Sequence, residues 1–92
     1  MDEPLPPGDA KRLLVDLIEN GTVTFSKHAR EEMAKDGLND QDALNVLRGG
    51  VVEPGEFENG SWRYRVRTSR MTCVVAFRSE TEARIVTAWR NK

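Results

Sequence analysis

Cysteine and histidine are almost absent from this sequence, which holds one residue of each type, Cys73 and His28. A single cysteine cannot form an internal disulfide, and one cysteine with one histidine cannot complete a four-ligand zinc site. We therefore expect a protein of a reducing cytoplasm that uses no metal ion and no other cofactor.

Long apolar runs are also missing. No stretch approaches the roughly 18 apolar residues of a transmembrane helix, and the N-terminus lacks the cationic start and apolar stretch of a secretory signal. The 92 residues are 38% hydrophobic and 32% charged, which is typical of one globular domain with no membrane role. The proline-rich residues 1–9 are expected to form a disordered or extended lead, and residues 10–92 a single domain.

Charge is unevenly distributed, although the formal net charge is only -1. Residues 1–60 contain six Lys and Arg against thirteen Asp and Glu, whereas residues 61–92 contain eight against two. A basic C-terminal third favours an anionic ligand at one face of the molecule.

Helical spacing of apolar residues occupies the first half of the chain. A short β-branched and aromatic run at residues 22–25 interrupts it and is a strand candidate. Asn20-Gly21 predicts a left-handed helix end, and Gly49-Gly50 ends the last helix. The expected helices cover residues 10–20, 26–37 and 39–48, with Asp9, Ser26 and either Asn39 or Asp40 as N-caps.

The pattern changes to alternation after Gly50, which predicts a β-sheet. Asn59-Gly60 is typical of a type I′ hairpin turn. We therefore expect an α+β fold with N-terminal helices packed on one face of a small antiparallel sheet. The candidate strands are Val51-Val52, residues 62–67, residues 71–77 and residues 83–90, and the hairpin turn lies between Phe57 and Trp62.

Arginines dominate one face of the strand expected at residues 62–67, where Arg63, Arg65 and Arg67 alternate with apolar residues. Guanidinium suits phosphate because its planar fork donates two parallel hydrogen bonds and never loses its charge. The alternative is a solvated face whose arginines pair with glutamates. Neighbouring strands and turns would extend the row through Arg70, Arg78, Arg84 and Arg90.

Cations also gather where the second helix is expected to begin, at Lys27, His28 and Arg30. This placement opposes the helix dipole, but it would strengthen an anion site at the free backbone amides. Glu32 follows His28 by four residues and is expected to orient the imidazole. The alternative is a surface histidine in an ordinary pair.

Four aromatic residues are expected in the core rather than as platforms for stacking bases, because alternation sends two of them, Trp62 and Tyr64, to the face opposite the arginines. A cysteine within an apolar strand is expected to be a buried, inert thiol. The expected core members are Ala29, Met33, Trp62, Tyr64, Cys73, Phe77 and Trp89.

The segment 23–38 resembles the histidine-alanine helix of a widespread prokaryotic family of small proteins similar to the MqsR and BrnT toxins of type II toxin-antitoxin systems. Companion features are the helix at 39–48 with its Gly-Gly-Val-Val exit, the strand at 62–66 and the closing residues 84–90. The sequence departs from the family pattern at Glu32 and Asp36, where arginines are common.

This resemblance implies a RelE-like fold and a metal-independent endoribonuclease that cleaves mRNA, either free or associated with the ribosome. It also implies a cognate antitoxin, which in the MqsR-like case carries a zinc finger. The expected reaction is attack of a ribose 2′-hydroxyl on the adjacent phosphorus. The alternative is a non-catalytic module that binds protein or RNA. The candidate catalytic residues are His28, Lys27, Arg65, Arg78 and Tyr64, and the candidate RNA-binding residues are Arg30, Arg63, Arg67, Arg70, Arg84 and Arg90.

Overall fold

The computed structural model describes all 92 residues as an α+β domain, which confirms the predicted fold class. None of its helices is long and apolar enough to cross a membrane. The elements in chain order are α1 (Pro7–Asn20), β1 (Thr22–Phe25), α2 (Lys27–Lys35), α3 (Asp40–Gly49), β2 (Val51–Val52), β3 (Glu56–Glu58), β4 (Ser61–Arg67), β5 (Met71–Phe77) and β6 (Glu82–Arg90).

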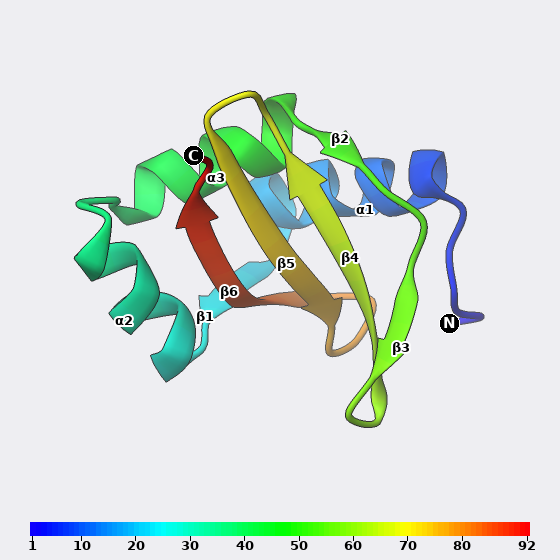
Figure 1. Ribbon diagram of the computed structural model, residues 1–92. Helices are drawn as coiled ribbons and strands as arrows, with labels where there is room; N and C mark the ends of the chain where they lie inside the picture. The colour runs from blue at the N-terminus through cyan, green and yellow to red at the C-terminus, as the bar shows by residue number, and fades with distance from the viewer.

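The strands form a six-stranded sheet in the order β1-β6-β5-β4-β2, with β3 paired to the first part of β4 (Figure 1). The predicted meander is confirmed, since β4, β5 and β6 pair antiparallel in sequence order. The predicted strand at residues 22–25 is also present, but it pairs parallel to β6. The sheet is therefore mixed rather than wholly antiparallel.

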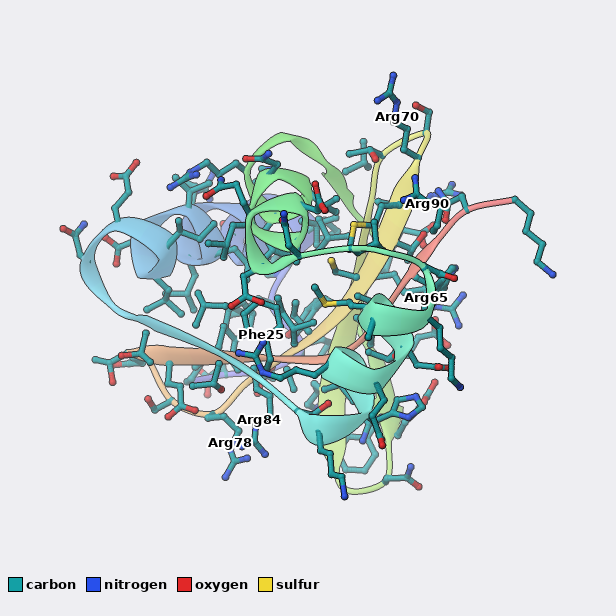
Figure 2. All side chains as sticks on the ribbon, turned by 90° about the vertical axis from the view of Figure 1, so that its left-hand side faces the viewer. Phe25, Arg65, Arg70, Arg78, Arg84 and Arg90 are labelled. Atoms are coloured by element: carbon teal, nitrogen blue, oxygen red, sulfur yellow. The ribbon has the colours of Figure 1, made fainter.

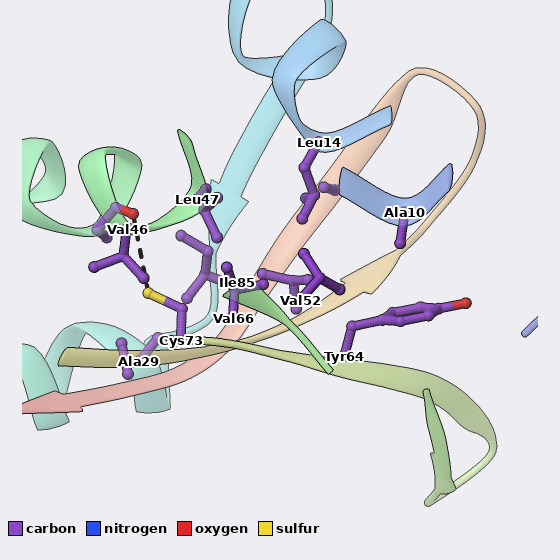
Figure 3. Close-up of a cluster of buried hydrophobic side chains, with 14 of the residues drawn as sticks. Ala10, Leu14, Ala29, Val46, Leu47, Val52, Tyr64, Val66, Cys73 and Ile85 are labelled. Atoms are coloured by element: carbon purple, nitrogen blue, oxygen red, sulfur yellow. Dashed lines mark hydrogen bonds between the residues drawn. The ribbon is translucent and has the colours of Figure 1, made fainter. Parts of the chain in front are cut away.

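Helices α1 and α3 pack together against one face of the sheet (Figure 1). The hydrophobic core lies between these helices and the sheet. Leu14 of α1 and Leu47 of α3 meet Val66 and Ile85 from the strands, and all four are fully buried (Figure 3). The Cys73 thiol is buried beneath α3, and burial raises its pKa to about 12. The predicted inert thiol is thus found in an environment that suppresses its thiolate form.

The start and the end of α1 differ from the sequence-based prediction. The helix begins at Pro7 rather than after Asp9, because proline at the first helical position loses no hydrogen bond and already has a helical φ. Gly21 ends the helix with φ -121°, not in the left-handed region. Its lack of a side chain matters for space, since a Cβ would lie 2.5 Å from Leu17 Cδ2 and 2.8 Å from the Thr81 carbonyl oxygen.

Helix caps and the hairpin turn are confirmed at the other predicted positions. The Ser26 hydroxyl accepts a hydrogen bond from the Ala29 N–H at 2.9 Å. Asn39 forms a capping box with Asp42, in which each side chain accepts a hydrogen bond from the other's backbone N–H. Asn59 and Gly60 have φ values of 48° and 82°, the positive values that a type I′ turn requires.

Helix α2 runs along the edge of β6 beyond the point where β1 ends. At its start, the Ser26 N–H donates to the Ile85 carbonyl at 2.9 Å and the Ser26 hydroxyl donates to the Val86 carbonyl at 2.6 Å. Just beyond its end, Asp36 accepts a hydrogen bond from the Arg90 N–H at 2.9 Å. The helix thus covers an edge of β6 that would otherwise expose unpaired backbone groups. Its buried residues Ala29 and Met33 belong to the common core, as predicted.

A β-bulge interrupts the pairing of β5 with β6. Val74 pairs with Thr87 but Val75 pairs with Ile85, so Val86 has no partner in β5. One extra residue moves every later side chain of a strand to the other face. Beyond the bulge, Trp89 therefore faces away from the helices, while Arg90 lies on the helix side with Ala88.

Candidate functional site

The sheet face opposite α1 and α3, here called the open face, carries no helix (Figure 1). Arg63, Arg65 and Arg67 of β4 project from it, as alternation predicted, because Tyr64 and Val66 between them are buried in the core. The pairings Arg65 with Val74 and Val74 with Thr87 continue this face across β5 to β6. The open face is therefore the surface on which the predicted arginine row must act.

The arginine hollow is a depression of about 370 Å³ at the end of the open face where β1 leads into α2. Three arginines line it, Arg63 from β4, Arg78 from the turn after β5 and Arg84 from β6. No acidic residue lines this hollow, and its other lining residues are Ser26, Ser61, Ala76, Phe77 and Val86.

The guanidinium groups at this hollow have few protein partners. Neither Arg78 nor Arg84 belongs to any of the four ion pairs of the structure. The Nε atom of Arg84 is buried without a hydrogen-bond acceptor, and Arg63 Nε–H makes only a long 3.4 Å contact to Ser61 Oγ. Uncompensated cationic donors around a concave surface suit an anion such as a phosphodiester.

The mixed hollow, of about 180 Å³, adjoins the first one and shares Arg63 with it. Two glutamates of β3, Glu56 and Glu58, line it beside the arginines, and Trp89 of β6 lines it as well. The seven lining residues are Glu56, Glu58, Arg63, Arg65, Val74, Thr87 and Trp89.

The predicted arginine row is only partly assembled. Arg67 lies on the open face but pairs with Glu53 at 3.6 Å, which is the glutamate pairing expected in the solvated-face alternative. Arg70 and Arg90 do not lie on the open face, so the prediction that they extend the row is wrong. They line a separate hollow near α3, and the Arg90 guanidinium donates to the Asp36 carbonyl at 3.0 Å.

Figure 2 shows this division, with Arg78 and Arg84 side by side at the lower edge of the view and Arg70 and Arg90 at the opposite end. In β6 this division of the arginines results from the bulge at Val86, because the bulge turns Arg90 to the sheet face opposite Arg84.

Tyr64 lies on the helix side of the sheet and is fully buried. Its hydroxyl donates to a Glu3 carboxylate oxygen at 2.8 Å and accepts from the Leu5 N–H at 2.9 Å. Burial raises the pKa of this phenol to about 12. Tyr64 therefore ties the N-terminal residues to the core and lies outside both hollows of the open face.

Arg30 and Glu32 of α2 are engaged with other partners than predicted. The Arg30 guanidinium lies 4.6 Å from the Phe25 ring centroid and pairs with Asp40 of α3 at 3.0 Å, so it faces the helix side. Glu32 pairs with Lys35 at 2.9 Å, and the predicted contact with His28 is not formed.

His28 and Lys27 are both exposed at the first turn of α2. Ala29 faces the core. Successive side chains of an α-helix are rotated by about 100° around its axis, so His28 and Arg30 point to opposite sides of Ala29. Because Arg30 turns toward α3, His28 turns toward the open face. His28 does not line the arginine hollow, and the lining residue nearest to it along the chain is Ser26, two residues earlier.

Sequence reasoning missed Glu56 and Glu58 and placed Trp89 in the core. The hairpin turn at Asn59-Gly60 is the signal that brings the two glutamates opposite β4, because the register pairs Glu56 with Arg63 and Glu58 with Ser61. No such signal in the sequence reveals the position of Trp89. Strict alternation from the buried Ile85 predicts that Trp89 lies on the core face. The other predicted aromatic core residues are confirmed, with Tyr64 and Phe77 buried and Trp62 packed against the cluster.

Residues 25–90 match the family model DUF4258, described as a domain of unknown function. Neither the curated proteins nor the solved structures gave a match to this chain. The family match includes the end of β1, both α2 and α3, and all strands that form the open face. Because it covers more than half of the chain, the protein belongs to the DUF4258 family.

Proposed function

We propose that this protein is a metal-independent endoribonuclease that binds RNA on the open face and cleaves it by attack of a ribose 2′-hydroxyl. The observation that carries the proposal is the arginine hollow, where Arg63, Arg78 and Arg84 surround one depression with no acidic residue in its lining. A phosphodiester is the anion that such a group of bidentate donors fits best.

The hollow supports cleavage as well as binding because of where negative charge increases during the reaction. The attacking 2′-oxygen forms a bond to phosphorus and the bond from phosphorus to the 5′-oxygen breaks. The transition state carries extra charge on the phosphoryl oxygens, and fixed guanidinium donors stabilise that charge more than the charge of the ground state. The products are a 2′,3′-cyclic phosphate and a 5′-hydroxyl.

His28, in the first turn of α2, is the proposed general base for RNA bound in the arginine hollow. Imidazole titrates nearest neutrality among the ordinary side chains, so it accepts a proton at physiological pH. In the proposed reaction it takes the proton of the 2′-hydroxyl, and water protonates the leaving 5′-oxygen. Lys27, exposed beside it, adds positive charge near the scissile phosphate.

The resemblance to MqsR-like and BrnT-like toxins supports the biological setting that we propose for this activity. The α+β architecture, with helices on one sheet face and the other face open, agrees with the arrangement that the RelE-like fold implies. In this setting the protein cleaves mRNA in the cytoplasm and an antitoxin encoded beside it blocks the open face.

A non-catalytic binding module is the second candidate. The observation that favours it is the acidic border of the open face, where Glu53 pairs with Arg67 and two further glutamates face Arg63 and Arg65. Such a mixed surface suits a protein partner, and it lowers the positive charge available for RNA.

Incubation of the purified protein with a defined single-stranded RNA distinguishes the two candidates. We expect fragments with 2′,3′-cyclic phosphate and 5′-hydroxyl ends, and we expect His28→Ala to slow cleavage by about 10²- to 10⁴-fold through loss of general base catalysis. Circular dichroism checks that the variant is folded, and Lys35→Ala at the other end of α2 is the matched control.

Intact RNA after incubation with the wild-type protein would contradict the nuclease and favour the binding module. Full activity of the folded His28→Ala variant would remove His28 from the mechanism but leave the arginine hollow as the site.

A further inference from the structure

We propose that the mixed hollow is a nucleobase subsite that selects guanine in single-stranded RNA. This inference rests on the proposed function, because it assigns a base to the nucleotide beside the phosphate in the arginine hollow. Arg63 lines both hollows, so the two depressions adjoin, as a phosphate site and a base site must.

Trp89 supplies a stacking surface at this hollow. Trp89 is half-buried on the open face and lines the depression together with Val74 and Thr87. A flat aromatic side chain beside a row of arginines is the combination by which proteins hold unpaired bases of single strands. The bulge at Val86 is what turns this ring outward, so a local irregularity of β6 creates the surface.

Two carboxylates lie at the same hollow with no ion-pair partner. Glu56 and Glu58 are exposed, and neither carboxylate belongs to an ion pair or accepts a hydrogen bond, although the Glu58 backbone carbonyl accepts one from the Ser61 hydroxyl at 3.5 Å. They are two residues apart on β3, so both project from one face, the same face as their partners Arg63 and Ser61. A free carboxylate accepts two parallel hydrogen bonds from adjacent N–H donors.

Guanine matches this arrangement better than the other bases. Its Watson–Crick edge has two adjacent donors, N1–H and the N2 amine, which fit a carboxylate. Its O6 and N7 acceptors fit a guanidinium bidentately, and Arg65 in the same hollow has no partner of its own. Adenine and cytosine offer one amine beside a ring acceptor, and uracil offers one N–H between two carbonyls, so each leaves a carboxylate facing an acceptor.

Binding of short 2′-O-methyl oligonucleotides tests the proposal, because these probes lack the attacking hydroxyl and stay intact. Each is a uridine run with one central guanosine, inosine, adenosine, cytidine or uridine. We expect the guanosine probe to bind about tenfold more tightly than the uridine probe, and inosine, which lacks the N2 amine, to lose most of that gain.

Variants identify the residues responsible. Glu56→Gln combined with Glu58→Gln is expected to abolish the guanine preference without weakening the binding of the uridine probe. The matched control is Glu80→Gln, at an exposed residue in the turn before β6. Trp89→Ala is expected to weaken every probe by about tenfold or more through lost stacking, and Trp89→Phe is expected to restore part of this loss. The glutamates are exposed, so their replacement leaves the core intact.

Equal binding of all five probes, or a guanine preference that is unchanged in the double variant of Glu56 and Glu58, would overturn the base subsite. Either result would leave the proposal of RNA binding on the open face unaffected. Failure of every probe to bind would overturn both this inference and the proposed function.

Discussion

Arg84 is the residue in which stability and function are most clearly opposed. Its Nε–H is buried without an acceptor, and a buried unsatisfied donor costs about 1–3 kcal/mol. The neighbouring Arg78 adds a second guanidinium without a carboxylate partner. Such uncompensated charge in a folded protein is explained if a bound anion supplies the missing acceptor.

Thermal unfolding in increasing inorganic phosphate tests this explanation for Arg84. Phosphate that binds only the folded protein is expected to raise the Tm of the wild type, and the rise is expected to be smaller for Arg84→Met. Without phosphate, Arg84→Met is expected to be at least as stable as the wild type, because the unsatisfied donor is gone.

Arg48→Met provides the control, since Arg48 is an exposed arginine in the last turn of α3. A phosphate-induced rise in Tm that is the same in the Arg84 variant as in the wild type would show that the buried Nε does not contact the anion.

Individual elements show where sequence reasoning succeeds and where it fails. Strand β4 follows strict alternation, so the placement of Arg63, Arg65 and Arg67 could be predicted from residue types alone. Strand β6 breaks alternation at Val86, and neither Trp89 nor Arg90 is where the pattern predicts. A bulge leaves no composition signal, because it depends on how the strand fits its neighbour.

Helix α2 depends on Ser26 for its position relative to the arginine hollow. The hydroxyl of Ser26 caps the helix through the Ala29 N–H and joins it to β6 through the Val86 carbonyl. Ser26→Ala is expected to lower the free energy of unfolding by about 1–2 kcal/mol, since both hydrogen bonds are lost.

Urea denaturation of the Ser26→Ala variant measures this change, and Ser69→Ala in the exposed β4–β5 turn serves as the control. A loss equal to that of the Ser69 variant would mean that the hydroxyl does not anchor α2.

The whole molecule separates its charges less completely than the sequence suggests. The fold class and the basic C-terminal third could be predicted, and the arginines of β4 indeed share one face. The sequence could not show that Arg90 lies at another hollow, because this depends on the bulge in β6 and on Asp36 beyond the end of α2. It also could not place Glu56 and Glu58 beside Arg63, which requires the register of the β3–β4 hairpin.

The central claim, that RNA phosphates bind in the arginine hollow, is tested most directly by the salt dependence of RNA binding. Each phosphate contact to a single strand contributes about 0.7 to the slope of log affinity against log salt concentration. The double variant Arg78→Met with Arg84→Met is expected to lower this slope by about 0.7 relative to the wild type, because the hollow holds one phosphate, while Arg48→Met leaves it unchanged. A double variant with the wild-type slope and affinity would contradict the account.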